Sequence, residues 1–421
     1  MKSLPRLLLS AIGLIGSTCI ADTLDYGEGL QNHTPPITLD NADHSRDHWQ
    51  AIGRLRTNTI CTATLIDSGH TLEARTPAYI LTAGHCIDHS NGRIATEQPI
   101  RGSITFNYFL DDAALKTYPL KTVKWRSMQG VDMAIVELDV SLQTLVEQGI
   151  KPLKLATATP APGTEVLIVG AALNDTLKLA ACTLEAAPDV IEDKWVWRSN
   201  FMTRCQGMRG GNSGSPLLDR YSNAIIGVVG TTNEDPGLPP CALNAPCIPT
   251  GNGYVAIQGN VYGNPVAHLH SCFYRGMLIQ RNCPLFPTFN VESDPPTPVS
   301  HKEIERSANG RPVFPTWAYR FSIDTAFYRH KTVRLAKLCE NPHKYSAAIS
   351  ATNAVIDTRI GARPGRYFLC IVGVNSASKK LEAGVLRNAL SVPMVLTGAE
   401  PFPHLDARLD GPQAHPAPTQ Q

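Results

Sequence analysis

Short apolar runs, separated by Gly, Pro, Asn and Asp, fill the chain from residue 49 to about residue 257. They are rich in β-branched residues, and runs of this length and composition predict the strands of an antiparallel barrel or sandwich. A modest helical segment is expected near 265–272. The expected strands are Ala51–Leu55, Cys61–Ile66, Ala78–Leu81, Ile104–Phe109, Asp132–Leu138, Glu165–Val169, Ala224–Val229 and Tyr254–Ile257.

A second group of apolar segments follows the proline cluster at 293–298. Prolines cannot propagate a helix or a central strand, so a stiff Pro-rich linker is expected over 291–309. The alternating segments beyond it predict a small β-sandwich-like C-terminal domain over 310–398. A Pro-rich tail over 399–421 is expected to be disordered. The expected strands of this domain are Tyr319–Ile323, Thr332–Leu338, Tyr345–Ala351, Tyr367–Val374 and Val392–Leu396.

The first residues have the layout of a secretory signal peptide. Lys2 and Arg6 precede an apolar stretch over 7–15, and Cys19-Ile20-Ala21 offers a cleavage site near Ala21. The apolar stretch is too short for a permanent membrane-spanning helix, although an N-terminal anchor is the alternative. We therefore expect a signal peptide over 1–21, an N-terminal extension over 22–48, a folded domain over 49–290, and a secreted or periplasmic protein without stable membrane insertion.

Composition and charge narrow the function classes. The chain of 421 residues has an apolar fraction of 43%, which excludes a wholly disordered protein. Lys and Arg number 38 against 36 Asp and Glu, and loss of Lys2 and Arg6 with the signal peptide would leave 36 of each. A neutral mature chain has no electrostatic footprint for nucleic acid. The 32 Gly and 32 Pro favour a loop-rich β protein over a helical bundle.

The cysteines indicate disulfides. The chain has 11, and cleavage after Ala21 would remove Cys19 and leave 10, an even number behind a signal peptide. Spacing alone leaves the connectivity open, and pairing of nearest neighbours is the simplest account. Zinc ligation is the alternative, but the tight Cys-x-x-Cys spacing of a structural site is missing. The nearest-neighbour pairs are Cys61 with Cys86, Cys182 with Cys205, Cys241 with Cys247, Cys272 with Cys283, and Cys339 with Cys370.

Three short segments carry the candidate chemistry: LTAGHC at 81–86, VDMAIVEL at 131–138 and GGNSGSP at 210–216. A serine hydroxyl is a poor nucleophile at neutral pH and needs an imidazole to take its proton. The imidazole needs a buried carboxylate to hold its tautomer and stabilise the imidazolium. Glycines beside the serine let two backbone N–H groups point at one developing oxyanion.

These segments, in this order, resemble the trypsin-like serine peptidases of the chymotrypsin fold over roughly 49–269. The resemblance implies a two-barrel catalytic domain, with His85 as the general base, Asp132 as the orienting carboxylate and Ser213 as the nucleophile. It places the oxyanion hole on the N–H groups of Gly211 and Ser213. It also implies that the Cys61–Cys86 disulfide ties the histidine loop to an adjoining strand.

The sequence departs from well-known members of this family at the residue before the nucleophile. Asn212 stands where digestive members carry an Asp that pairs with an amino terminus released by cleavage. Asn cannot form that ion pair, so we expect activity that does not depend on such a terminus. The string GNSGSP is closer to a bacterial-type branch that includes glutamyl endopeptidases.

The expected specificity pocket carries no charge. Val229 stands where glutamyl endopeptidases have a pocket histidine, and Gly207 stands where trypsin has its pocket Asp. Thr231 and Thr232 are expected to narrow the pocket wall, so we expect a small-to-medium uncharged side chain at the scissile residue. The resemblance further implies that 230–232, beginning at Gly230, pairs with the substrate as an added antiparallel strand.

Other candidate residues have simpler interpretations. Asp111 and Asp112 form a pair of carboxylates, but a loop or turn role is favoured. Trp195 and Trp197 would share one strand face, where packing is favoured over a substrate platform. The sequence thus predicts a secreted serine endopeptidase acting on polypeptides, without metal or organic cofactor. The alternative is a catalytically silent pseudoprotease or an adhesive protein, whose C-terminal domain holds a surface or protein ligand.

Overall fold

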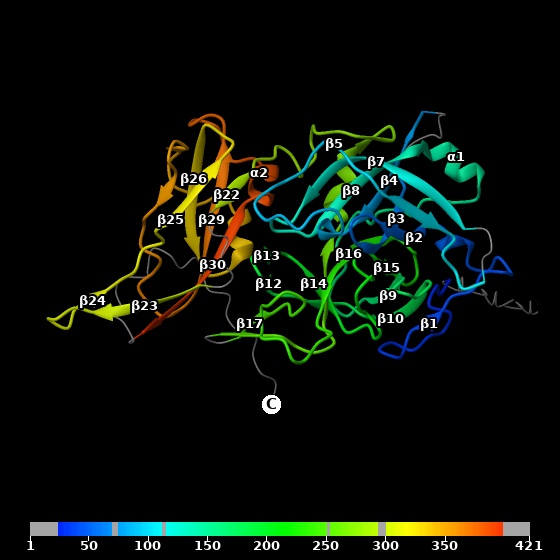
Figure 1. Cartoon of the computed structure of the whole chain (residues 1–421), viewed down its shortest axis with the longest axis horizontal. Coiled ribbons are helices and arrows are strands. Elements are labelled where there is room, and N and C mark those ends of the chain that lie inside the picture. Colours follow the sequence, from blue (N-terminus) through cyan, green and yellow to red (C-terminus); the bar gives the residue numbers. More distant parts are fainter. Residues whose placement is uncertain (1–23, 70–74, 112–114, 251–252, 294–299, 399–421) are drawn as a thin grey trace, which may run out of the picture.

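The computed structural model describes residues 24–69, 75–111, 115–250, 253–293 and 300–398. The predicted signal peptide and the predicted tail therefore lie outside the described residues. Strands dominate this part of the chain (Figure 1), and none of its helices is long and apolar enough to cross a membrane. The short helices are α1 (Leu142–Glu147), α2 (Ala383–Arg387) and the 3-10 helices η1 (Asp47–Trp49), η2 (Gly84–Cys86), η3 (Ala267–Cys272) and η4 (Ala336–Glu340).

The first barrel is closed. Its strands follow the order β7-β6-β2-β3-β4-β8, and β7 pairs with β8 to complete the ring. Strand β6 illustrates why this sequence forms strands. Ile104 and Phe106 are buried, whereas Ser103 and Thr105 are only partly buried. This alternation is the period-2 pattern of a strand with one face toward the core. The strands are β2 (Ile52–Arg56), β3 (Ile60–Ile66), β4 (Pro77–Thr82), β6 (Ser103–Phe106), β7 (Lys116–Ser127) and β8 (Met133–Ser141), with β5 (Gln98–Pro99) at the edge of β7.

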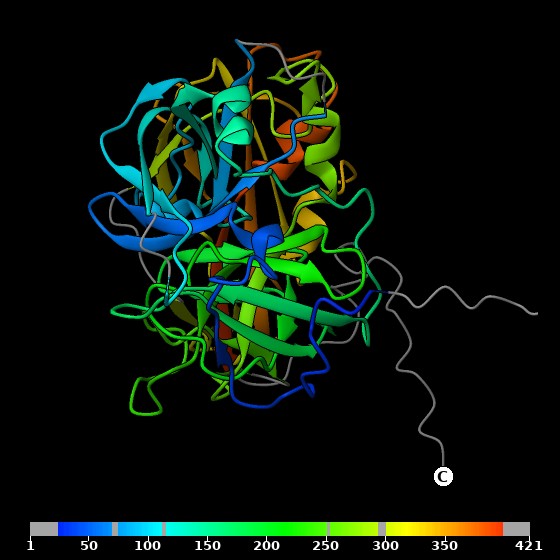
Figure 2. The ribbon, with the colours of Figure 1, turned by 90° about the vertical axis from the view of Figure 1, so that its right-hand side faces the viewer.

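The second barrel sheet has eight strands in the order β1-β10-β9-β15-β16-β19-β14-β11. Strand β1 belongs to the predicted N-terminal extension, which runs along this sheet in Figure 2. The Asp25 carboxylate accepts two hydrogen bonds from the Arg220 guanidinium, at 2.7 and 2.8 Å, and fixes the extension there. The strands are β1 (Ile37–Thr38), β9 (Glu165–Gly170), β10 (Lys178–Thr183), β11 (Glu185–Ala186), β14 (Phe201–Thr203), β15 (Pro216–Asp219), β16 (Ile225–Thr232) and β19 (Val261–Pro265).

The C-terminal unit consists of two facing sheets. One has the order β22-β25-β28 and the other β24-β23-β30-β29-β26-β27. Side chains of both, among them Phe321 and Leu369, share one hydrophobic core. The fold class predicted from the sequence, a two-barrel all-β fold followed by a sandwich-like β unit, is confirmed. The strands are β22 (Val291–Ser293), β23 (Ser300–Arg306), β24 (Pro312–Val313), β25 (Tyr319–Ile323), β26 (Phe327–Val333), β27 (Ile349–Ser350), β28 (Val355–Ile356), β29 (Gly365–Val374) and β30 (Leu390–Gly398).

Two predicted strands of this unit are wrong for most of their length. The segment 332–338 leaves β26 at Val333 and turns into η4, and 345–351 contributes only the two residues of β27. The stretch 291–309, predicted as a linker, contributes β22 and β23 to the two sheets. The predicted helical segment near 265–272 forms the 3-10 helix η3.

A hairpin of β12 (Val190–Glu192) and β13 (Trp195–Trp197) connects the two-barrel part to the C-terminal unit. Ile191 and Val196 of this hairpin belong to the core of the C-terminal unit. Both hairpin ends are held by buried charged side chains. Asp189 accepts the backbone N–H groups at the start of η4, and Arg198 donates to the carbonyl of Ala389 and the hydroxyl of Ser391, each at 2.7 Å. We call these two residues the hairpin clamp.

Two further hairpins, β17 (Ile248–Thr250) with β18 (Gly253–Val255) and β20 (Phe273–Tyr274) with β21 (Met277–Leu278), complete the strands of the described residues.

All five nearest-neighbour disulfides predicted from the sequence are present in the structure. The disulfides are Cys61–Cys86, Cys182–Cys205, Cys241–Cys247, Cys272–Cys283 and Cys339–Cys370.

Candidate active site

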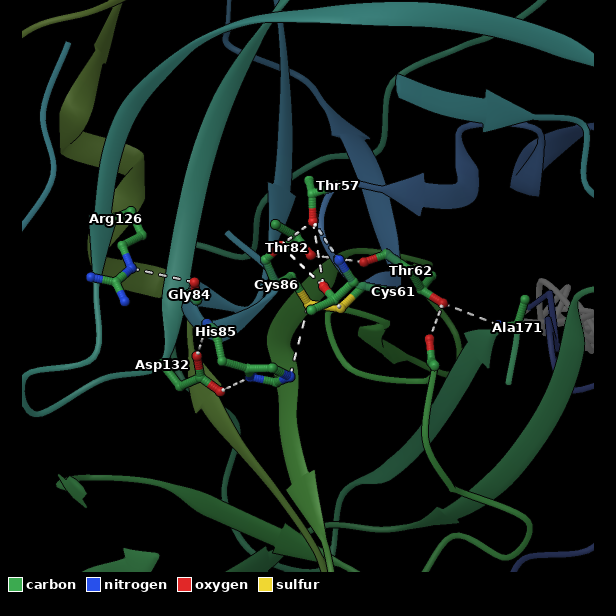
Figure 3. The surroundings of a disulfide bond; sticks show 12 residues. Thr57, Cys61, Thr62, Thr82, Gly84, His85, Cys86, Arg126, Asp132 and Ala171 are labelled. Carbon is green, nitrogen blue, oxygen red and sulfur yellow. Dashed lines mark hydrogen bonds and ion pairs between the residues drawn. A yellow bond between two sulfur atoms is a disulfide. The ribbon is translucent and has the colours of Figure 1, made fainter. Parts of the chain in front are cut away.

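His85 and Asp132 meet where the two barrels face each other. Asp132 precedes β8 and is fully buried. Its Oδ2 lies 2.8 Å from His85 Nδ1, and its Oδ1 accepts the backbone N–H of His85 at 2.9 Å. Figure 3 shows the imidazole between this carboxylate and the Cys61–Cys86 disulfide. The two hydrogen bonds fix both the backbone and the ring of His85, and its Nε2 lies 3.9 Å from the disulfide sulfur of Cys86.

His85 and Asp132 also shift each other's pKa electrostatically. Burial lowers the pKa of His85, but the charge of Asp132 and its hydrogen bond outweigh burial and hold the pKa above the ordinary value. Burial raises the pKa of Asp132, but the charge of His85 and its hydrogen bonds outweigh burial and hold the pKa below the ordinary value. The arrangement therefore favours an ionised carboxylate beside an imidazole that accepts a proton readily.

Ser213 lies on a tight loop that contacts the first barrel. Its carbonyl accepts the N–H of Thr62 at 2.9 Å, and the next residue, Gly214, has φ +83°. A Cβ on Gly214 would lie 2.1 Å from the Thr62 carbonyl oxygen, so only glycine fits this turn. Ser213 lines the same cleft as His85. Within the described residues, no hydrogen bond joins the Ser213 hydroxyl to His85 Nε2.

The peptide units before Gly211 and before Ser213 are each anchored by their carbonyl oxygen. The Gly210 carbonyl accepts the N–H of Leu173 at 2.8 Å, and the Asn212 carbonyl accepts the N–H of Ser215 at 3.0 Å. In a trans peptide the N–H points opposite to the carbonyl, so the N–H groups of Gly211 and Ser213 are turned away from these contacts. Among the described residues, neither N–H donates a hydrogen bond. The N–H groups of Gly211 and of Ser213 itself are therefore fixed in position and free to donate to a ligand.

Sequence reasoning missed the residue that holds this loop from the other barrel. The Thr62 hydroxyl donates to the Gly211 carbonyl at 3.1 Å and accepts the N–H of Ala171 at 3.1 Å. Thr62 belongs to β3, an apolar strand in which a threonine signals only β propensity. Its role follows from the packing of the two barrels and not from local pattern.

The predicted substrate-binding residues separate in space. Gly230, Thr231 and Thr232 line the cleft, which has a volume of about 320 Å³. Gly207 lines a neighbouring hollow, where Thr232 also lies. Asn212 is buried, and its side-chain amide donates to the carbonyl of Arg209 at 3.2 Å.

The hairpin β12–β13 forms another wall of the cleft. Trp195 and Trp197 pack in a cluster with Met128, the favoured interpretation, and both also line the cleft, where the alternative of a substrate platform would place them. Glu192 of the same hairpin lines it too, and sequence reasoning missed this residue. A three-residue strand gives no periodic signal, so no local pattern distinguished its carboxylate from a surface one.

The described residues do not favour a metal at this site. Cys61, His85 and Cys86 form the one group close enough together to be considered there, but both sulfurs are in a disulfide and offer no thiolate.

Asp111 accepts the backbone N–H groups of Asn41 and Ala42, the loop role expected for it, whereas Asp112 lies outside the described residues.

Comparisons with known proteins agree with this geometry. Residues 61–228 match the family model of the trypsin-like peptidase domain, a range that includes His85, Asp132 and Ser213. This part of the chain is therefore similar to a trypsin-like peptidase domain. A search of curated proteins finds no match.

Solved structures similar to this chain include serine proteases. A thermostable serine protease, AL20, from an extremophilic microorganism has 16% identity and a TM-score of 0.35, over 52% of this chain and 92% of that chain. A Glu endopeptidase has 18% identity and a TM-score of 0.34, over 47% and 85%. The protease Rv3671c from M. tuberculosis H37Rv has 14% identity and a TM-score of 0.35, over 55% and 89%.

Proposed function

We propose that this protein is a secreted serine endopeptidase of the bacterial-type branch, which cleaves polypeptides through an acyl-enzyme. The observation that carries the proposal is the coincidence, around one cleft, of an imidazole held by a buried carboxylate, a serine on a tight loop and two unused N–H donors. The match of 61–228 to the peptidase family supports the same reaction class.

In the proposed mechanism, the Ser213 hydroxyl attacks the scissile carbonyl while His85 Nε2 takes its proton. The proton then passes from His85 to the leaving amine, and water repeats the sequence in reverse to release the acid. Asp132 holds the Nδ1–H tautomer and stabilises the imidazolium. The N–H groups of Gly211 and Ser213 stabilise the oxyanion, which develops only in the transition state.

The remaining features fit an enzyme outside the cytoplasm. Five disulfides suit an oxidising compartment, and the predicted signal peptide would deliver the chain there. We propose that 230–232 pairs with the substrate backbone, that the scissile residue is small to medium and uncharged, and that a catalytic domain over 49–290 is followed by a C-terminal domain that includes β22 and β23 in addition to the predicted 310–398.

Labelling with a fluorophosphonate probe tests the proposal, because such probes react with activated serines. The wild-type protein should be labelled and should cleave peptides, and Ser213→Ala should do neither. Ser215→Ala is the matched control: this buried hydroxyl has no hydrogen-bond partner among the described residues, so its loss should leave labelling intact.

Absence of labelling in folded, disulfide-bonded wild-type protein would refute the proposal. The pseudoprotease or adhesive alternative would then be favoured, and binding partners of the C-terminal unit would be sought.

A further inference from the structure

Glu192 is a buried carboxylate within the candidate substrate cleft that the proposed mechanism does not use. It ends β12, is 4% exposed and lines the cleft together with His85 and Ser213. Its Oε1 accepts the backbone N–H of Asn244 at 2.7 Å, and the Thr231 side chain also bonds to it. The carboxylate is therefore held in place beside the segment proposed to pair with substrate.

Within the described part of the chain, the charge of His85 acts on this carboxylate, but no lysine or arginine pairs with it. No ion pair between described residues involves Glu192. Glu234 and Asp235 line the same cleft and add negative charge, whereas Arg209 of the cleft is paired with Asp175. A buried carboxylate without a partner is costly, and a cation from outside would relieve that cost.

Beside the carboxylate stands an aromatic wall. The Trp195 and Trp197 rings are stacked, with centroids 6.2 Å apart and planes 9° apart, and each residue is 3% exposed. His89 continues the wall toward the catalytic imidazole, 6.1 Å from Trp195 and 5.7 Å from His85. Flat aromatic faces favour the aliphatic stem and the cationic head of Lys or Arg, and the ammonium of the chain's own Lys194 already lies 5.2 Å from the centroid of the Trp195 ring.

Building on the proposed endopeptidase function, we propose that Glu192 is a specificity-determining residue that binds a Lys or Arg side chain of the substrate against the wall of Trp195 and Trp197. The basic residue lies on the part of the substrate that pairs with 230–232. It is distinct from the uncharged residue at the scissile bond.

The charge of this subsite depends on pH. Burial raises the pKa of Glu192 to about 7, so it is neutral below and ionised above that pH. Preference for a basic side chain should therefore grow as the pH rises through about 7. The other ionisable groups that act on Glu192 or line its cleft are His85, His89, Asp132, Arg209, Glu234 and Asp235.

Matched peptide pairs test the proposal. Peptides with Lys or the neutral isostere norleucine are compared at each of the positions N-terminal to the scissile residue. Wild type should show at least about a tenfold higher kcat/KM for Lys at one position, a factor equivalent to one paired charge. Glu192→Gln should abolish that preference while still cleaving the norleucine peptide. Glu147→Gln, an exposed glutamate of α1, is the matched control and should keep the preference.

The ratio of the two rates against pH tests the proposal without a variant. Ionisation of His85 affects both peptides alike and cancels in the ratio, so a rise through about pH 7 reports the subsite. Equal cleavage of Lys and norleucine peptides by a protein that the fluorophosphonate probe labels overturns the subsite alone, as does a preference that survives in Glu192→Gln. A protein that is neither labelled nor active overturns the proposed function and the subsite with it.

Discussion

Asp132 gives the sharpest prediction at the scale of single residues. In Asp132→Asn the amide would keep the shape but lose the charge and favour the wrong tautomer of His85. The kcat should fall by about 10⁴, with little change in KM. Steady-state kinetics on one peptide measures this. The matched control is Asp139→Asn, an exposed position on β8 that should leave kcat unchanged. A loss below tenfold for Asp132→Asn would contradict the proposed orienting role.

The same pair predicts the pH dependence of activity. His85 must be neutral to accept a proton, and its pKa lies above the ordinary 6.5 because Asp132 outweighs the effect of burial. The kcat/KM should therefore rise with pH, with a midpoint above 6.5. The profile is measured with an uncharged peptide in both wild type and Glu192→Gln, because the charge of Glu192 also raises the pKa of His85. A midpoint below 6.5 would show that the Asp132 charge does not reach the imidazole as described.

At the scale of elements, the hairpin clamp decides how the cleft wall is held. Arg198→Met would keep most of the volume but leave the carbonyls of Arg387 and Ala389 without their donor. The free energy of unfolding should fall by about 3 kcal/mol, the usual cost of breaking a buried charged contact, and kcat/KM should fall as the wall of Trp195 and Trp197 loses its support. Urea unfolding and peptide kinetics measure the two effects.

The matched control for the clamp is Arg204→Met. Arg204 pairs with Glu185 at the surface and is 58% exposed, so its loss should cost no more than about 0.5 kcal/mol. Equal, small losses in the two variants would mean that the clamp contributes no more than a surface ion pair.

Elements also show how far the sequence alone could lead. Strand β25 occupies the predicted range, because its alternation reflects a sheet with one buried face. The prediction failed just after β26, where η4 begins at residues whose N–H groups are accepted by Asp189, 147 positions earlier in the chain. No local sequence pattern predicts that so distant a residue accepts the first N–H groups of a helix. Glu192 was missed for the same reason, since its burial depends on Asn244 and on the packed hairpin.

The candidate site was more predictable than its cleft. His85, Asp132 and Ser213 lie in short segments whose chemistry and order are informative, and the structure brings all three to the meeting of the barrels. The cleft walls come from β13, the 234–244 loop and the nucleophile loop, which meet only in the folded molecule. Local motifs therefore singled out the candidate residues, whose roles stay predictions, whereas the cleft residues placed by tertiary packing had no local signal.

At the scale of the whole molecule, the two-barrel part and the C-terminal unit are in direct contact. Ile191, Val196 and the Cys241–Cys247 disulfide belong to the C-terminal core, and Gln129 donates to the Asn388 carbonyl at 2.6 Å in a buried contact. We expect calorimetry to show a single unfolding transition, because neither unit keeps its core closed when the other opens. Two well-separated transitions would contradict this coupling. Arg198→Met should broaden or split the transition.

The clamp also ties activity to the order in which the chain is made. Asp189 and Arg198 precede the nucleophile, but the groups that they hold belong to η4, to the residues around Ala389 and to the start of β30, the last strand of the described chain. During synthesis, the loop that carries Ser213 is therefore complete before the groups that hold the hairpin beside it. For the exported peptidase proposed above, activity is expected only after β30 has joined its sheet.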